Sequence, residues 1–166
     1  LLVKPIMKVL LEFFTIHYIA LENLIAGDGT SVVKTLFPDV KDMALLKRIN
    51  NYLVENLSVE RLLSAVTILD ATKVISSVSD MMTELEENTG IRLTNNQRVT
   101  LYVHVSAMIE RLIRNEPPLV YKVVSSEERK QGCTKIKRAL RNIESSYGIK
   151  VDQNELNYLY DIVFQL

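Results

Sequence analysis

Apolar residues recur along this chain at intervals of three and four, the spacing that places them on one face of a helix. Two such stripes are well separated: Val40, Met43, Leu46, Ile49, Leu53 and Leu57, then Val74, Ile75, Val78, Met81, Met82 and Leu85. No window longer than four or five residues alternates strictly between apolar and polar positions with turns on both sides. The pattern therefore predicts an all-α fold, a bundle of helices.

Polar residues and glycines mark where these helices should begin and end. Asp70 is a good N-cap for a helix that should stop before Gly90, which suits a left-handed C-terminal cap. Thr94-Asn95-Asn96-Gln97 has the form of a capping box, and its helix should run to about Asn115, before two prolines.

Two further helices are predicted in the last third of the chain. Ser125 or Ser126, followed by acidic residues, should start a single helix that ends near Gly148. Asp152-Gln153-Asn154-Glu155 repeats the capping-box pattern and should start a last helix.

The chain also contains an internal similarity. Residues 85–104 align with residues 143–162 at a constant offset of 58, with six of twenty positions identical. The identical pairs are Glu86/Glu144, Gly90/Gly148, Ile91/Ile149, Asn96/Asn154, Leu101/Leu159 and Tyr102/Tyr160. Any two helices joined by a short turn tend to have such glycines and caps, but this common arrangement does not require the Tyr, Asn and Ile matches in register. We therefore favour two pseudo-repeated helical halves, in which His104 has Ile162 as its counterpart.

Composition and charge exclude several classes of function. The chain has 166 residues, 20 of them basic and 20 acidic, so neither a general nucleic-acid clamp nor a polybasic membrane anchor is expected. One cysteine and two histidines leave no disulfide framework, and we expect no metal site and no cofactor. The apolar opening segment is too short and too charged to span a bilayer, so we expect a cytoplasmic protein. Because the first residue is Leu, we expect a fragment or a processed chain.

His104 is the main candidate for chemistry. It should lie mid-helix, about 60° from the centre of the buried stripe, with Arg111 two turns further along the same flank. Histidine offers a neutral nitrogen as a nucleophile near pH 7, and the planar guanidinium of Arg111 suits phosphate oxygens. A phosphoryl group on His104 could thus be met by Arg111. The competing interpretation is that His104 simply packs at the helix border or is solvated there.

Other polar residues are better explained structurally. His17 sits among apolar residues, and Cys133 lacks a base with an orienting partner, so packing is expected for both. The basic run Lys135, Lys137, Arg138 and Arg141 is expected to be a solvated helix face. No phosphate loop, nucleophile elbow or zinc-protease motif is present, so we expect no enzyme.

The segment TGIRLTNNQRVTLYVHVSAMIERLIRNEPP, with SYGIKVDQNELNYLY later, resembles the phosphotransferase-system regulation domain, or PRD. This all-helical family, built from two pseudo-repeated halves, regulates bacterial sugar operons. The resemblance implies that His104 is a phosphorylated histidine and that Arg111 is the basic residue accompanying it. Many members have a second histidine after an E-x-x-[FY]-[IL] pattern, which here begins at Glu155, but that histidine position falls on Ile162.

The resemblance also implies partners and a division of the chain. The phosphodonor would be the histidine-containing phosphocarrier protein or an enzyme IIB, the module would form a homodimer, and this fragment would not contact nucleic acid or membrane. HYIALENLIAGDG is similar to the end of the enzyme IIB-like domain of levulose-operon-type activators, which act with an alternative sigma factor. The predicted parts are residues 1–30, a remnant of that domain, 31–66, a helical connector, and 67–166, the PRD.

Two interpretations remain open beside this one. A structural dimerisation module would have a well-packed His104 with a fixed hydrogen bond, whereas a phosphoacceptor would have a ring nitrogen that solvent reaches, near Arg111. A small helical enzyme would need polar groups converging in a pocket, and no set of residues requires one.

Overall fold

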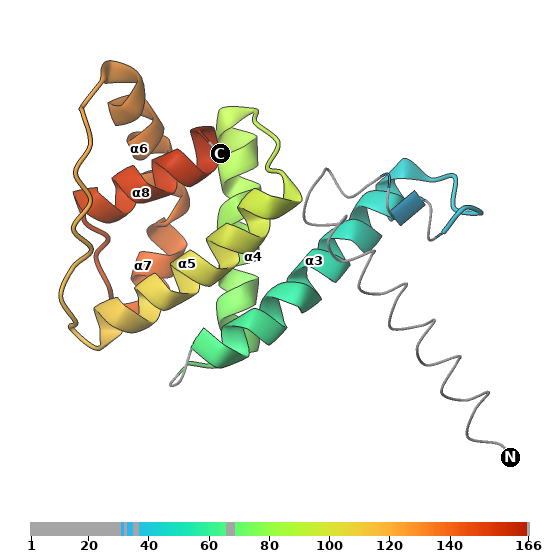
Figure 1. Cartoon of the computed structure of the whole chain (residues 1–166), viewed down its shortest axis with the longest axis horizontal. Coiled ribbons are helices and arrows are strands. Elements are labelled where there is room, and N and C mark those ends of the chain that lie inside the picture. Colours follow the sequence, from blue (N-terminus) through green and yellow to red (C-terminus); the bar gives the residue numbers. More distant parts are fainter. Residues whose placement is uncertain (1–30, 32, 35–36, 66–68, 166) are drawn as a thin grey trace, which may run out of the picture. The chain divides into compact units, whose positions relative to one another are not determined.

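The computed structural model describes residues 31, 33–34, 37–65 and 69–165, and the side chains of 56–65 lie outside that description (Figure 1). Every regular element among them is helical, which confirms the predicted all-α fold. The elements are α3 (Met43–Ala65), α4 (Ala71–Thr89), α5 (Asn95–Ile113), α6 (Glu127–Ala139), α7 (Arg141–Tyr147) and α8 (Gln153–Phe164). The predicted remnant at residues 1–30, with His17, lies outside the described residues.

The chain divides into two compact units, Leu1–Val54 and Glu55–Leu166. In the described part of the first unit, the predicted stripe is only partly buried. Leu46 is buried, Val40, Ile49 and Leu53 are half-buried, and Met43 is 58% exposed.

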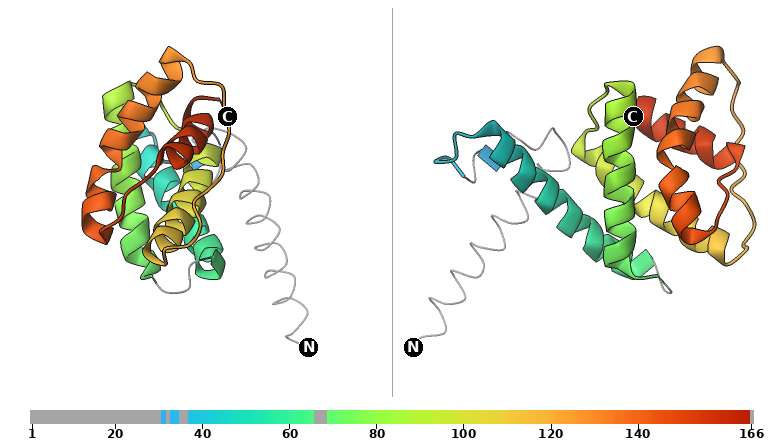
Figure 2. Two further views of the ribbon diagram at one scale, coloured as in Figure 1. Left: turned by 90° about the vertical axis from the view of Figure 1, so that its left-hand side faces the viewer. Right: turned by 180° about the vertical axis from the view of Figure 1, so that it is seen from behind.

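Five helices, α4 to α8, build the core of the second unit. In Figures 1 and 2, α4 stands beside the column formed by α6 and α7, and α5 and α8 cross them. The apolar stripe predicted on α4 faces inward, and all six of its residues are buried. Fully buried side chains from the other helices, together with Leu140 between α6 and α7, complete this core: Leu101, Met108, Ile109, Ile136, Ile143 and Leu159.

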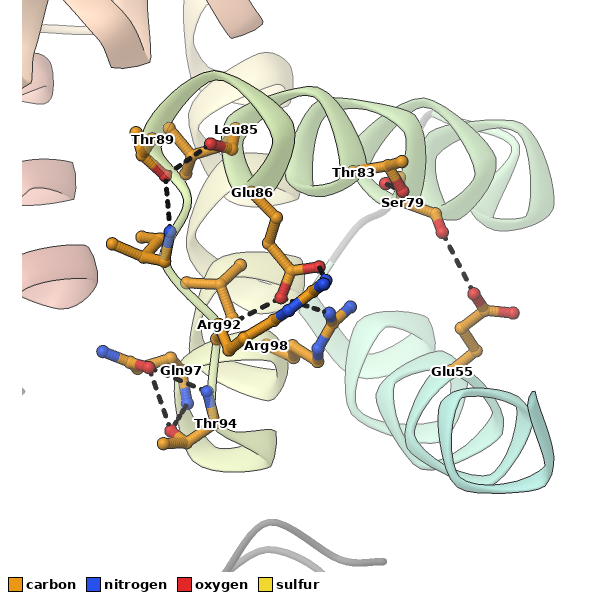
Figure 3. Close-up of polar contacts among 12 residues, drawn as sticks. Glu55, Ser79, Thr83, Leu85, Glu86, Thr89, Arg92, Thr94, Gln97 and Arg98 are labelled. Atoms are coloured by element: carbon orange, nitrogen blue, oxygen red, sulfur yellow. Dashed lines mark hydrogen bonds and ion pairs between the residues drawn. The ribbon is translucent and has the colours of Figure 1, made fainter. Parts of the chain in front are cut away.

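Local side-chain hydrogen bonds fix the starts of α4 and α5 as the sequence predicts, and Figure 3 shows those of Thr94 and Gln97 at the start of α5. Asp70 accepts from the backbone N–H groups of Thr72 and Lys73 at the start of α4. Thr94 and Gln97 close a complete capping box at the start of α5. A helix cap of this kind stabilises a protein by about 1 kcal/mol.

The two halves repeat one turn in detail. Gly90 and Gly148 both adopt the left-handed conformation, with φ of 73° and 65°. The carboxylate of Glu86 accepts the backbone N–H of Leu93 at 2.8 Å, and the carboxylate of Glu144 accepts that of Val151 at 2.7 Å. Both pairs keep the offset of 58 residues found in the sequence. The internal similarity is therefore a repeat in the structure as well as in the sequence.

The single helix predicted from Ser126 to Gly148 is wrong, because the segment is interrupted at Leu140. The backbone N–H of Leu140 donates to the carbonyl oxygens of Ile136 and Arg138, four and two residues before it, and the chain then restarts as α7. Leu140 itself is completely buried, and both α6 and α7 contact α4. The bend keeps both segments against α4, so tertiary packing overrides a continuous helical pattern here.

Candidate phosphoacceptor site

His104 lies in the middle of α5 at the border between core and solvent. Its side chain is 17% exposed, and Nε2 is 3.1 Å from Oε2 of Glu155 on α8. The imidazole also packs on the ring of Tyr158, one helical turn after Glu155, with ring centroids 4.3 Å apart. The ring is thus held on one edge and one face by α8.

Glu155 is the centre of this cluster, and its side chain is completely buried. One carboxylate oxygen faces His104, and the other is paired with the guanidinium of Arg111. Burial alone would raise the pKa of Glu155, but the hydrogen bond to His104 and the positive charge of Arg111 outweigh it and lower the pKa. The carboxyl group is therefore ionised at neutral pH, although water does not reach it.

Arg111 approaches the same carboxylate from α5, two turns beyond His104. Its side chain is 21% exposed, yet its Nε is buried and has no hydrogen-bond partner among the described residues. A buried donor left without an acceptor costs about 1–3 kcal/mol. His104 and Arg111, the two residues selected from the sequence, are therefore joined through Glu155. The sequence analysis had considered Glu155 only as part of a capping box and of the E-x-x-[FY]-[IL] pattern.

The second ring nitrogen of His104 has different surroundings. Nδ1 makes no hydrogen bond in the described part of the chain, and it is not among the buried polar atoms that lack a partner. Nδ1 therefore reaches solvent while Nε2 faces the buried carboxylate. Such a ring offers one nitrogen to a docking molecule and keeps the other inside the bundle.

The capping box predicted at Asp152 is only half formed. Asp152 accepts the backbone N–H of Glu155, as an N-cap should. In a full box the side chain of Glu155 would reach back to the cap, as Gln97 does in the other half. The carboxylate is instead directed to His104 and Arg111. The capping-box pattern in the sequence therefore explained Glu155 as a cap residue and gave no indication of its contacts with His104 and Arg111.

A second polar cluster supports the outer side of α8. Tyr121 donates to Asp161 at 2.6 Å, and Arg129 bonds to the same carboxylate at 2.7 Å. The ring of Tyr121 meets that of Tyr158 edge to face, with centroids 5.2 Å apart. The segment between α5 and α6 is thereby tied to the residue on which His104 rests.

The counterpart of His104 is a core residue. Ile162 is 1% exposed, and Nε2 of Gln97 donates to its carbonyl oxygen at 3.0 Å and to that of Val163 at 3.1 Å. Gln97 is itself the counterpart of Glu155. The same cross-helix contact is thus made in both halves, to main chain in one and to an imidazole in the other.

The remaining candidate residues have structural or solvent-exposed positions. Cys133 is 3% exposed, and burial raises the pKa of its thiol. Lys135, Arg138 and Arg141 are exposed as predicted, whereas Lys137 is half-buried and donates to Glu144 at 2.6 Å. Among the described residues, no three His, Cys, Asp or Glu side chains are grouped to hold a metal ion. No helix in the described ranges has the length and apolar character needed to cross a bilayer.

Comparison with known proteins places this geometry in context. The PRD domain family matches residues 79–165, which is more than half of the chain. The chain is also similar to transcriptional regulatory protein DagR of Salmonella typhimurium strain 14028s, with 21% identity over 154 residues. That alignment covers 90% of this chain but only 16% of DagR, so the chain spans about a sixth of that relative's length. No solved structure matches the chain.

Proposed function

Because this chain belongs to the PRD domain family, we propose that it is the regulatory phosphoacceptor module of a bacterial transcription regulator, phosphorylated on His104. The donor in this proposal is a carrier of the sugar phosphotransferase system, either the histidine-containing phosphocarrier protein or an enzyme IIB. The observation that carries the proposal is the two-sided environment of His104, whose Nδ1 reaches solvent while Nε2 is held at Glu155.

The electrostatics of the site are suited to a transferred anion. A phosphoryl group adds a charge of about −1.5 to −2 near neutral pH. Arg111 is within the same cluster and has a buried N–H group that lacks an acceptor. A phosphoryl oxygen would supply such an acceptor, and the flat guanidinium can hold two oxygens at once.

The proposal extends to the architecture of the longer protein. The similarity to DagR over a sixth of its length supports a module within a larger transcription regulator, which this proposal takes to be of the levulose-operon type. In this arrangement, residues 1–30 end an enzyme IIB-like domain, residues 31–66 connect it, and residues 67–166 form the PRD, which acts as a homodimer. Phosphorylation of His104 would change how these parts control transcription, without direct contact of the module with DNA.

The phosphoacceptor role is tested by incubating the chain with phosphoenolpyruvate, enzyme I and each candidate carrier. The variants are His104→Ala and, as a matched control, His17→Ala, because the chain has just these two histidines. Acid-labile phosphate should appear on the wild type and on His17→Ala but not on His104→Ala. Equal labelling of the wild type and His104→Ala would contradict the assignment.

A second candidate is a dimerisation module that is never phosphorylated. The fixed contact of His104 with Glu155 and the packing on Tyr158 favour it, because a purely structural imidazole would be held in this way. The two functions differ in the phosphorylation assay. A dimer by sedimentation, with no label from any carrier, would support the structural module instead.

A further inference from the structure

The tautomer of His104 follows from its partner. An ionised carboxylate can only accept hydrogen bonds, so at 3.1 Å the Nε2 atom facing Glu155 must carry the proton. The guanidinium of Arg111 on the other oxygen keeps the carboxylate ionised, which excludes the reverse arrangement with a proton on Glu155. A neutral imidazole protonated at Nε2 has its lone pair on Nδ1, the nitrogen that reaches solvent.

The comparison between the two halves indicates that this contact is more than a means of joining helices. Gln97, at the equivalent position, closes a capping box and also links α5 to α8 through two main-chain carbonyls. An uncharged amide is therefore sufficient for the structural task. Glu155 gives up the cap and places a negative charge in a fully buried position, and the residue that it faces in the other half is a histidine, His104, whereas Gln97 faces Ile162.

We propose that Glu155 is a positioning residue that holds the Nε2–H of His104 and thereby makes Nδ1 the atom that receives the phosphoryl group. This inference rests on the proposed function and specifies its chemistry. The lone pair of Nδ1 attacks phosphorus, the new N–P bond forms, and the bond from phosphorus to the carrier's imidazole nitrogen or thiolate breaks. The bonding pair leaves with the carrier, and no proton has to move.

The product of that step explains why a carboxylate is required. A ring that carries a phosphoryl group on Nδ1 and a proton on Nε2 is an imidazolium, with a positive charge that the ring did not have before. The carboxylate of Glu155 lies against that proton and stabilises the charge, as a buried aspartate does for the histidine of a serine protease. Attack by Nε2 would instead bring a dianion against the buried carboxylate, with like charges in contact.

Two measurements on the unmodified protein test this inference. The ¹⁵N spectrum of the imidazole of His104, recorded where titration shows the ring to be neutral, should report a proton on Nε2 and a bare Nδ1. After transfer from a phosphorylated carrier, ³¹P–¹H correlation should place the phosphorus on Nδ1. A proton on Nδ1, or phosphorus on Nε2, would overturn the inference.

Two variants distinguish a positioning role of Glu155 from a role in stability alone. Glu155→Gln should populate both tautomers, slow phosphoryl transfer at least about tenfold, and give a mixture of the two phosphohistidine isomers. Glu144→Gln is the matched control, since it makes the same chemical change at a half-buried structural carboxylate, and it should leave the tautomer, rate and isomer unchanged. If Glu155→Gln does not fold, the two wild-type measurements still decide the question.

Failure of this inference is distinguishable from failure of the proposed function. Absence of any label on His104 would overturn both the phosphoacceptor role and the assignment of Nδ1, even if the tautomer is as expected. Label on Nε2 would retain the function and overturn only the role given to Glu155. A folded Glu155→Gln variant with an unchanged rate of phosphoryl transfer and an unchanged phosphohistidine isomer would likewise retain the function and overturn only the role given to Glu155.

Discussion

Gln97 and Glu155 occupy the same position in two repeated halves, 58 residues apart, yet only Gln97 closes the cap of its own helix. The side chain of Glu155 turns instead toward His104 and Arg111. The position that Glu155 faces across the helices holds an imidazole, His104, whereas the equivalent position faced by Gln97 holds a core aliphatic residue, Ile162. The two equivalent cross-helix contacts therefore differ in both of their residues: one joins Gln97 to Ile162, and the other joins Glu155 to His104.

Acid should destabilise the fold through Glu155. Its pKa is lower in the folded chain than its ordinary value of 4.5, so the unfolded chain binds more protons as the pH falls. The stabilising contribution is complete above about pH 4.5 and is lost as the pH falls through the folded pKa. Urea unfolding of wild type and Glu155→Gln between pH 3 and pH 7 should show a steeper acid loss in the wild type. Parallel curves would contradict the assignment of this carboxylate.

The two glycine caps should respond alike to substitution. Gly90 and Gly148 have left-handed φ values, and a Cβ at either position would meet no atom within 4 Å. Alanine therefore introduces backbone strain and no collision, and each variant should lose about 1–2 kcal/mol of unfolding free energy. Thermal unfolding of the two single variants measures this, and losses that differ several-fold would argue against equivalent turns.

Cys133 should be protected in the folded chain. Its side chain is 3% exposed, and burial raises the pKa of the thiol, so little thiolate is available at neutral pH. Alkylation by iodoacetamide should be slow under native conditions and should speed up at least about a hundredfold in urea, because only the thiolate reacts. Equal rates in both conditions would show that the α6–α8 contact opens readily.

The sequence predicted most of what depends on local chemistry. Caps at Asp70 and Thr94, the turn at Gly90 and the helical stripe of α4 all follow from spacing and side-chain type, and the structure has each of them. The break at Leu140 was not predicted, because packing against α4 decides it and no Gly or Pro marks the place.

The candidate site was predicted only in part, for a related reason. His104 and Arg111 share one helix, so a spacing of seven residues was enough to associate them. Glu155 comes from another helix, 51 residues away from His104, and its local sequence already had a satisfactory explanation as a cap. A contact between helices is set by tertiary structure, and the local pattern concealed it.

Arg111 should be needed both for stability and for the lifetime of the phosphorylated state. Arg111→Ala removes one of the two partners of a fully buried carboxylate, which costs about 3–5 kcal/mol when a buried pair is broken. Arg111→Lys retains the charge without the planar fork, so it should recover most of the stability but hold a phosphoryl group less well. Chemical unfolding and the decay of label on His104 measure the two effects separately. Equal decay in wild type and Arg111→Lys would exclude bidentate contact.

Restoring a histidine to the second half tests the pairing of residues across the repeat. Ile162→His places an imidazole at a buried position opposite Gln97, whose amide already donates to the main chain, so the variant should lose about 2–4 kcal/mol. Gln97→Glu should be destabilising alone, because its carboxylate would face two carbonyl oxygens. Together the two changes recreate the His–Glu pair, and their unfolding energies should be non-additive by about 1–3 kcal/mol in the stabilising direction. Additive losses would mean that the pair at His104 and Glu155 depends on surroundings that the other half does not share.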